Sequence, residues 1–250
     1  MKITEKITRL DLSHSNENLT GTWQEDVPKT YYFLKGYALG KEYSNMQKSL
    51  IIARQLHSGQ FRDDGAEYIV HPLRVCDYLV ALGMNDDILL SSALLHDVIE
   101  DVPFIRDNPR VLITEFELDP EILEVITILT KTKGMDKEVY FERIKKDWRA
   151  MFVKLSDRVN NISTLSTFDI QRRYKYINET RDSILPLCSY GKLFYPELSN
   201  KITCIKYHLT SMCDTVRLLT EQYTEKQKQE QETTKAKTEK EDTAPNPEGT

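Results

Sequence analysis

The sequence predicts an all-α fold, and three observations support this. Apolar residues recur at spacings of three and four over most of residues 43–222, which is the period of an amphipathic helix. No convincing alternation of apolar and polar residues marks a half-buried strand. Helix-starting residues, such as Asn85 and Pro120, stand where apolar stripes begin.

The apolar stripes give the expected helices in chain order. Asn85 is expected to cap the third helix, with Asp86 and Asp87 in its first turn, where negative charge is favourable. Pro120 suits the first turn of the fourth helix. The expected helices are Met46–Leu56, Leu73–Val80 closed by Gly83, Ile88–Leu95, Pro120–Leu129, Tyr140–Ile144, Phe152–Ile162 and residues 196–222.

The two ends of the chain differ from the middle. Residues 1–42 are polar with short apolar islands, and we expect an irregular N-terminal extension. From residue 224 onward the only apolar residues are two alanines, too few to offset chain entropy. We therefore expect one folded domain over residues 43–222 and a disordered charged tail over residues 223–250.

Composition narrows the class of protein. A net charge of −5 and a pI near 5.7 argue against broad nucleic-acid binding. No apolar run is long enough to span a bilayer, and the N-terminus lacks the apolar core of a secretory signal. The four cysteines show no paired CxxC spacing. These features predict a reduced, cytoplasmic protein without a membrane partner, and they leave its oligomeric state open.

The third expected helix is apolar nearly all round, yet it ends in charged residues. It leads into His96, Asp97, Glu100 and Asp101 before Pro103. A buried ionised carboxylate is very costly unless it is compensated. A divalent cation bound to these side chains would supply that compensation.

Two other segments add side chains of the same kind. His71 precedes a proline and therefore stands at a helix entrance, where the backbone holds the imidazole rigidly. Asp157 shares a helix face with Asn161 and Thr164, away from the apolar stripe. Imidazoles and carboxylates are ligands that Mn²⁺, Zn²⁺ or Fe²⁺ accepts.

The ordered set of His71, His96–Asp97 and Asp157 on helices resembles the HD metal-dependent phosphohydrolase superfamily. Further motifs resemble the hydrolase domain of the RelA/SpoT family over about residues 44 to 190. They are AxxxHxGQ at Ala53–Gln60, GxxYxxHPxxV at Gly65–Val75, ALLHDVIED at Ala93–Asp101, LTK at 129–131, VKLSDRxxN at Val153–Asn161 and ETxxxxxPL at Glu179–Leu187.

The resemblance implies an HD-domain helical bundle with a metal site between core helices. It implies Mn²⁺-dependent removal of the 3′-pyrophosphate from the guanine nucleotide (p)ppGpp, so that ppGpp gives GDP and pyrophosphate. Bifunctional members continue into a synthetase domain of well over a hundred residues. Only about sixty residues follow the match here, so we expect a stand-alone small alarmone hydrolase.

The resemblance also implies roles for individual residues. Glu100 and Asp101 are the expected catalytic pair, with Glu100 orienting or deprotonating the attacking water. His57 is expected to be structural. Lys154 and Arg158 flank Asp157, and they either face phosphates or form structural ion pairs. The expected metal ligands are His71, His96, Asp97 and Asp157, and the expected nucleoside contacts are Arg62, which packs on the guanine base, Asn161 and Thr164.

Two residues depart from the family pattern and leave the substrate open. Asp63 stands where a basic residue usually follows the arginine, and Asn160 stands where histidine is usual. The Asp63 carboxylate favours a rival interpretation, in which the same fold acts on another phosphorylated nucleotide such as NADPH. A further alternative is a nucleotide-sensing module that no longer turns over.

Overall fold

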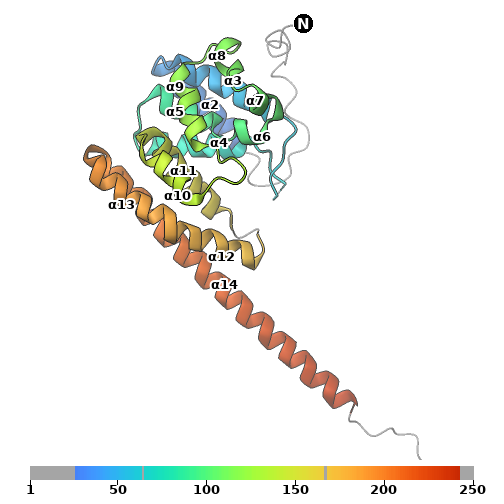
Figure 1. Cartoon of the computed structure of the whole chain (residues 1–250). Coiled ribbons are helices and arrows are strands. Elements are labelled where there is room, and N and C mark those ends of the chain that lie inside the picture. Colours follow the sequence, from blue (N-terminus) through green and yellow to red (C-terminus); the bar gives the residue numbers. More distant parts are fainter. Residues whose placement is uncertain (1–25, 64, 166–167, 243–250) are drawn as a thin grey trace, which may run out of the picture.

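The protein is a bundle of helices from which the last helix projects (Figure 1). The computed structural model describes residues 26–63, 65–165 and 168–242. Over these residues it has no strand, only an isolated antiparallel bridge between Phe61 and Glu67, so the expected all-α fold is confirmed. The elements are α2 (Asp26–Gly40), α3 (Ser44–Leu56), α4 (Val70–Ala81), α5 (Asp87–Leu95), α6 (Val98–Asp101), α7 (Pro103–Asp107), α8 (Val111–Thr114), α9 (Pro120–Leu129), α10 (Lys137–Lys145), α11 (Trp148–Ser163), α12 (Ile170–Glu179), the π-helical turn η2 (Thr180–Ile184), α13 (Leu185–Phe194), the 3₁₀ turn η3 (Pro196–Leu198) and α14 (Ser199–Asp242).

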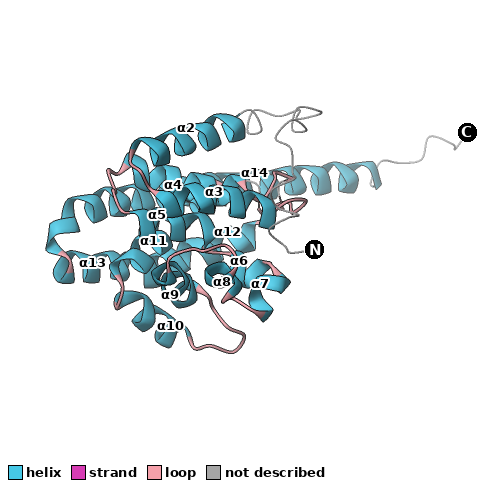
Figure 2. Cartoon of the chain, turned by 90° about the horizontal axis from the view of Figure 1, so that it is seen from above, coloured by secondary structure: helices cyan, strands magenta, loops and turns pink. Residues whose placement is uncertain are grey.

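Helix α5 is the centre of the bundle. All its residues from Leu89 to Leu95 are buried, as a helix without a polar face requires. It packs against α3, α4, α9 and α11, and Figure 2 shows these helices gathered around it. Because His96 follows α5 directly, its imidazole is buried in the bundle, whereas Glu100 and Asp101, one turn farther along the chain, are exposed.

The start of α5 lies one residue later than the sequence indicated. Asp86, not Asn85, is the N-cap: its carboxylate accepts from the Leu89 amide at 2.7 Å. The Asn85 side chain instead accepts from the Tyr37 hydroxyl. Asp87 accepts from the backbone amides of Asn45 and Met46 at the start of α3. Three consecutive polar residues thus accept from donors in three different parts of the chain, which sequence alone does not separate.

Helix α11 lies beside α4 and α5 and begins at the cap of Asp147, which accepts from the amides of Arg149 and Ala150. Its apolar residues, including Phe152, Leu155 and Ile162, are buried. This packing directs the neighbouring polar face toward the ends of α4 and α5.

The expectation of an irregular N-terminal extension is wrong for residues 26–40, which form α2. Tyr31, Leu34 and Ala38 are spaced by three and four residues and are buried against the core, so tertiary packing stabilises this short amphipathic segment. Residues 1–25 lie outside the described residues. Helices α7 and α8 and the helical run from Ile170 to Phe194 were not predicted from the sequence.

The expectation of a disordered tail is wrong as far as Asp242, because α14 continues to that residue. Ile202, Ile205 and Leu209 anchor the first part of the helix in the core, so elongation needs no new nucleus. The residues that follow are mostly Lys, Glu, Gln and Thr, of which the first three propagate helices well. Residues 243–250 lie outside the described residues. No helix in the described part is long and apolar enough to cross a bilayer.

Deletion of residues 224–250 should change the melting temperature by less than about 2 °C, because the described side chains from Glu225 to Gln231 are exposed. Leu209→Ala, on the same helix but in the core, should cost about 2–5 kcal/mol. Thermal unfolding followed by circular dichroism checks both variants. A truncation as destabilising as Leu209→Ala would show that the tail packs on the bundle.

Candidate metal centre and active site

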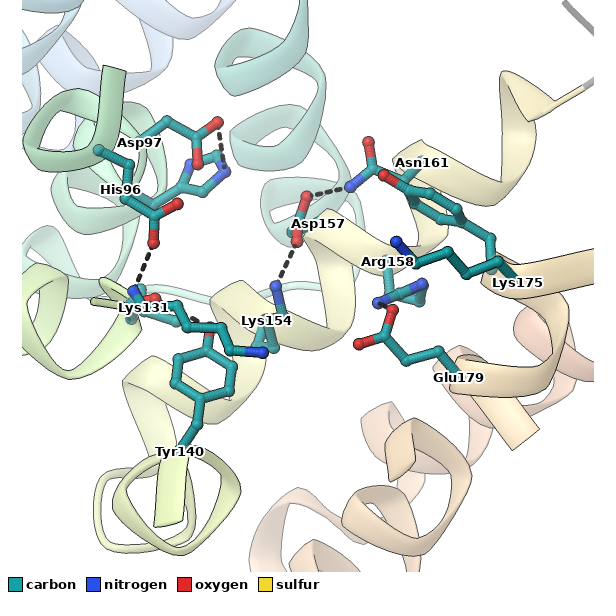
Figure 3. Close-up of a pocket in the computed structure, with 13 residues that line it drawn as sticks. His96, Asp97, Lys131, Tyr140, Lys154, Asp157, Arg158, Asn161, Lys175 and Glu179 are labelled. Atoms are coloured by element: carbon teal, nitrogen blue, oxygen red, sulfur yellow. Dashed lines mark hydrogen bonds and ion pairs between the residues drawn. The ribbon is translucent and has the colours of Figure 1, made fainter. Parts of the chain in front are cut away.

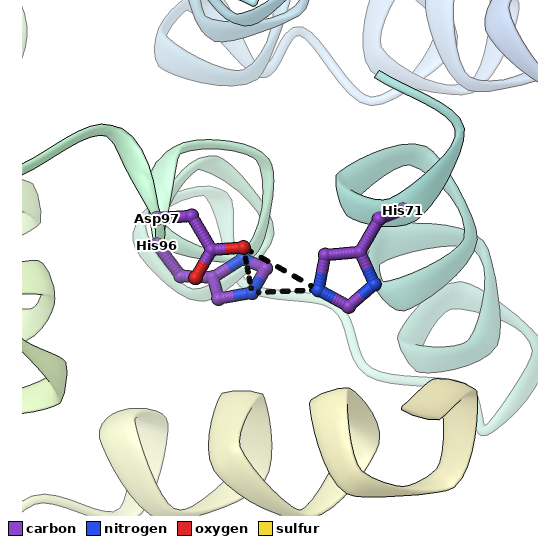
Figure 4. A group of neighbouring side chains, drawn as sticks. All are labelled: His71, His96 and Asp97. Carbon is purple, nitrogen blue, oxygen red and sulfur yellow. Dashed lines mark hydrogen bonds and ion pairs between the residues drawn. The ribbon is translucent and has the colours of Figure 1, made fainter. Parts of the chain in front are cut away.

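The four expected metal ligands meet between the start of α4, the end of α5 and the middle of α11. His71 Nε2 lies 3.2 Å from His96 Nε2, 3.4 Å from Asp97 Oδ2 and 3.3 Å from Asp157 Oδ1. His96 Nε2 lies 3.2 Å from Asp97 Oδ2. Figure 4 shows the two imidazoles and Asp97 converging above α11. Both histidines and Asp157 are buried.

Hydrogen bonds on the far side of each ring orient the two imidazoles. His96 Nδ1 lies 2.8 Å from the Ala93 carbonyl oxygen, and His71 Nδ1 lies 2.7 Å from Asn160 Oδ1. Oxygens of this kind only accept, so each Nδ1 carries a hydrogen and each Nε2 points inward, toward the other ring. Two Nε2 atoms 3.2 Å apart are placed to share one cation.

This donor set fits a divalent cation. Two imidazole nitrogens and two carboxylate oxygens are ligands that such a metal accepts, and the carboxylates balance its two charges. The backbone carbonyl and the amide that hold the far ring nitrogens are the partners that metal-binding histidines usually have. The described residues of this site therefore meet the chemical requirements of a metal centre.

Lys154 keeps Asp157, one of the expected ligands, ionised. Its Nζ lies 3.0 Å from Asp157 Oδ2, while Oδ1 of the same carboxylate faces His71. Burial opposes the charge on Asp157, but Lys154 and His71 outweigh it and hold the pKa of Asp157 well below its usual value. Burial likewise opposes the charge on Lys154, and Asp157 outweighs it and raises the pKa of Lys154. Both groups are charged at neutral pH.

A cavity of about 310 Å³ opens beside the ligands (Figure 3). Four cationic side chains contribute to its wall: Lys131, Lys154, Arg158 and Lys175. The wall also includes two tyrosines, Tyr140 and Tyr176, and three of the expected ligands, His96, Asp97 and Asp157. The cavity thus places the ligand cluster and a set of cations around one space.

The two expected catalytic carboxylates lie in different places. Glu100 lines the cavity, and its Oε1 accepts from the Lys131 backbone amide. Burial raises the pKa of Glu100 and the Asp97 charge adds to this, although the Lys131 amide opposes both. Asp101 is exposed and is absent from the described cavity wall; its carboxylate interacts with the Tyr68 hydroxyl.

The expected nucleoside residues gather at the end of α11. Arg62 Nη2 donates to Asn161 Oδ1 at 3.1 Å, and Asn161 Nδ2 donates to Asp157 Oδ1 at 2.5 Å. The Thr164 hydroxyl donates to the Asn161 carbonyl oxygen at 3.2 Å. Asn161 lines the cavity, whereas Arg62 is absent from its described wall. Arg62 and Thr164 therefore flank the cavity at the Asn161 side.

Arg158 is both an ion-pair partner and a cavity residue. Its Nη2 lies 2.8 Å from Glu179 Oε2, and its guanidinium lies over the Tyr176 ring at 5.0 Å. The side chain is only 5% exposed. Among the described residues, Arg158 Nε and Nη1 have no hydrogen-bond partner. Arg158 therefore has donors that its ion pair does not use.

Several residues of the site were not predicted from the sequence. The Tyr68 hydroxyl donates to Asp97 Oδ2 at 2.7 Å, and its ring stacks on His57 at 4.7 Å between centroids. His57, expected to be structural, is buried and bonds to Gln60. Tyr68, Lys131 and Glu179 lie within the motifs quoted from the sequence, which was the available signal. Lys175 and Tyr176 lie in no such motif.

Each of the two departures from the family pattern has a partner. Asp63 forms an ion pair with Arg172 of α12, so a guanidinium offsets its negative charge. Asn160 accepts from His71. The side-chain amide of Asn160 is therefore the hydrogen-bond partner of His71 Nδ1.

The chain is similar to known proteins both in sequence and in structure. Residues 49–187 match the family model described as "HD domain". The chain is 34% identical over 146 residues to the guanosine-3′,5′-bis(diphosphate) 3′-pyrophosphohydrolase of Haemophilus influenzae, covering 55% of this chain and 21% of that protein. It is 31% identical over 162 residues to the bifunctional (p)ppGpp synthase/hydrolase SpoT of Escherichia coli, covering 62% and 23%. The chain thus spans about a fifth of the length of these relatives.

A solved structure shows the same fold. It belongs to a protein described as a metazoan ortholog of SpoT that hydrolyzes ppGpp. It aligns with a TM-score of 0.50 and 21% sequence identity, and the alignment covers 69% of this chain and 93% of that one. Together with the family model, this similarity confirms the expected HD-domain helical bundle.

Glu179→Gln should destabilise the protein at neutral pH and much less in acid. Burial opposes the charge on Glu179, but Arg158 outweighs it and lowers the pKa of Glu179 below its ordinary 4.5. A lowered carboxyl pKa contributes stability above the unfolded pKa that is lost as pH falls through the folded one. Urea unfolding near pH 7 should show a loss of about 1–3 kcal/mol in the free energy of unfolding, and this loss should shrink below about pH 4.5.

The control is Asp182→Asn, which removes an exposed ion pair with Arg181 and should cost under about 1 kcal/mol. A loss for Glu179→Gln that does not change with pH would contradict the ion-pair argument.

Proposed function

The chain belongs to the HD-domain family, and from this premise we propose that it hydrolyses the 3′-pyrophosphate of (p)ppGpp. With ppGpp the products are GDP and pyrophosphate. The proposal is supported by the names of the relatives in Haemophilus influenzae and Escherichia coli. It is also supported by the motifs shared with RelA/SpoT-type hydrolase domains across residues 44 to 190.

One structural observation carries the proposal. The ligand cluster borders a cavity whose wall includes Lys131, Lys154, Arg158 and Lys175. A nucleotide with two diphosphate groups needs cations beside the reacting phosphorus, and charge-assisted hydrogen bonds to phosphate are among the stronger ones. Arg158 lines the same cavity and keeps its charge beside it while it pairs with Glu179.

We propose Mn²⁺ as the metal, held by His71, His96, Asp97 and Asp157. These residues would hold a divalent metal, which when bound would lower the pKa of a bound water toward neutrality and would polarise a phosphoryl oxygen. The protein's own contribution is to hold the ligands deprotonated: Lys154 stabilises the Asp157 carboxylate, and Tyr68 donates to Asp97.

We propose Glu100 as the residue that orients the attacking water and takes its proton. It lines the same cavity as His96 and Asp97, and the amide of Lys131 fixes its carboxylate. Asp101 supports the reaction through Tyr68, which it contacts. Arg62, Asn161 and Thr164 hold the nucleoside, with the Arg62 guanidinium packed on the base. Lys154 and Arg158 bind the phosphates.

A second substrate class remains a rival because of Asp63. A carboxylate near the nucleotide weakens the attraction to an additional phosphate and favours another phosphorylated nucleotide such as NADPH. The ion pair with Arg172 reduces this effect, which is why we place (p)ppGpp first. A site without turnover is disfavoured, since the ligands and Glu100 are all present. The cytoplasmic location and the lack of a nucleic-acid partner stay predictions from the sequence.

Purified protein supplied with Mn²⁺ should convert ppGpp to GDP and intact pyrophosphate. It should release phosphate from NADPH much more slowly. Product separation by anion exchange distinguishes these outcomes. Stepwise loss of single phosphates from ppGpp, or faster release of phosphate from NADPH, would contradict the proposed reaction and would favour another phosphorylated nucleotide as the substrate.

His96→Ala and Asp157→Ala should each yield a folded helical protein with greatly weakened Mn²⁺ binding and no measurable turnover. The reason is that each removes one of four ligands from a cluster that supplies no replacement donor. Metal content measured after gel filtration, together with circular dichroism, checks this. Stoichiometric Mn²⁺ retained by either variant would exclude that residue as a ligand.

Glu100→Gln should keep both Mn²⁺ and substrate binding, because Glu100 is not among the proposed ligands and an amide repels phosphate less than a carboxylate does. Turnover should fall by about 10²–10⁴-fold, as is typical when a general acid–base group is lost. Calorimetric binding of Mn²⁺ and single-turnover kinetics separate the two effects. Near-normal turnover would show that Glu100 does not act on the water.

A further inference from the structure

One amide oxygen serves two parts of the site at once. Asn160 lies in the last turn of α11 and is 9% exposed. Its Oδ1 accepts from His71 Nδ1 at 2.7 Å and, at the longer distance of 3.5 Å, from Arg62 Nη1. His71 belongs to the candidate metal centre, whereas Arg62 belongs to the nucleoside side. Asn160 therefore contacts both.

The next residue, Asn161, also connects Arg62 to the candidate metal centre. Arg62 Nη2 donates to Asn161 Oδ1, and Asn161 Nδ2 donates to Asp157 Oδ1. Asp157 Oδ1 in turn lies 3.3 Å from His71 Nε2. The contacts form a ring: His71 to Asn160, Asn160 to Arg62, Arg62 to Asn161, Asn161 to Asp157, and Asp157 back to His71.

We propose that Asn160 is a positioning residue that couples metal binding to nucleoside binding. By accepting from Nδ1 it turns the lone pair of His71 toward the metal, and by accepting from Nη1 it holds the Arg62 guanidinium for the base. The identity of the base rests on the proposed function. Because coupling between two sites is reciprocal, a bound metal then strengthens nucleoside binding, and the nucleoside strengthens metal binding by the same factor.

The proposed coupling depends on having an amide oxygen, rather than a histidine nitrogen, at position 160. An amide oxygen has two lone pairs and can serve two donors at once. The histidine that is usual at this position in the resembling family has at most one acceptor nitrogen, so it cannot accept from both His71 and Arg62. The substitution Asn160→Asp keeps an oxygen acceptor, whereas Asn160→Leu keeps the approximate size of the side chain and removes the acceptor.

The first measurement is Mn²⁺ binding by calorimetry on the full chain, without nucleotide. Asn160→Leu should bind Mn²⁺ about 10- to 100-fold more weakly, as is usual when the partner of a metal-binding histidine is lost. Asn160→Asp should bind it at least as tightly as wild type. Ser156→Ala is the matched control: Ser156 is buried on the same helix and its hydroxyl has no partner among the described residues. Unchanged Mn²⁺ affinity in Asn160→Leu, or an equal loss in the control, overturns the proposal.

The second measurement isolates the coupling. Guanosine has no phosphate that can contact the metal directly, so any effect of Mn²⁺ on its affinity must pass through the protein. In wild type, Mn²⁺ should tighten guanosine binding by about 5-fold or more, as followed by NMR titration. Asn160→Asp should keep this ratio, and Asn160→Leu should lose it. A ratio of one in wild type, or an equal ratio in wild type and Asn160→Leu, overturns the coupling.

Two further comparisons separate the proposed coupling from a folding defect and from the proposed function. If Asn160→Leu does not fold, Asn160→Ala removes the acceptor without adding an apolar branch and carries the same expectations. The Mn²⁺ arm contains no nucleotide, so its result does not depend on the reaction. A protein that meets both expectations but leaves ppGpp intact would contradict the proposed function alone.

Discussion

The close approach of two imidazole nitrogens, held 3.2 Å apart in the interior, is the constraint on which the arrangement of this molecule depends. Each ring is fixed from behind, by Ala93 in one case and Asn160 in the other, so neither can turn away. A helix that is buried on all sides leads directly into His96 and Asp97, and two neighbouring helices supply the other two expected ligands, His71 and Asp157. The packing of α4, α5 and α11 is thus also the geometry of the site.

Around the ligands, the charges alternate in sign instead of forming one acidic patch. Lys154 pairs with Asp157, Arg158 pairs with Glu179, and the Lys131 amide binds the Glu100 carboxylate. Each carboxylate near the cavity is thereby held in a defined position by a partner. The Lys154 and Arg158 side chains also border the cavity, so under the proposed function the groups that pair with carboxylates in the resting protein would also bind phosphate.

Much of the site could be predicted from the sequence because spacing encodes it. The order of His71, His96, Asp97 and Asp157 resembles that of a known family, and these four expected ligands do lie near one another in the structure; their role as ligands stays a prediction. The apolar stripe of Tyr31, Leu34 and Ala38 was present but short, and α2 was missed because its stability comes from the core. The shared oxygen of Asn160 depends on side-chain conformations across 98 residues of separation from Arg62, which spacing does not encode. Lys175 faces the cavity only because α12 folds back beside α11.

The projecting end of α14 has a consequence for how the molecule moves in water. The helix has 44 residues, which at about 1.5 Å per residue gives a rod roughly 66 Å long. Figure 1 shows it extending well beyond the bundle. A particle of this shape tumbles anisotropically and has a larger frictional coefficient than a sphere of 29.2 kDa. Its apparent mass from gel filtration will therefore exceed its true mass even for a single chain, and light scattering is the measurement that gives the true value.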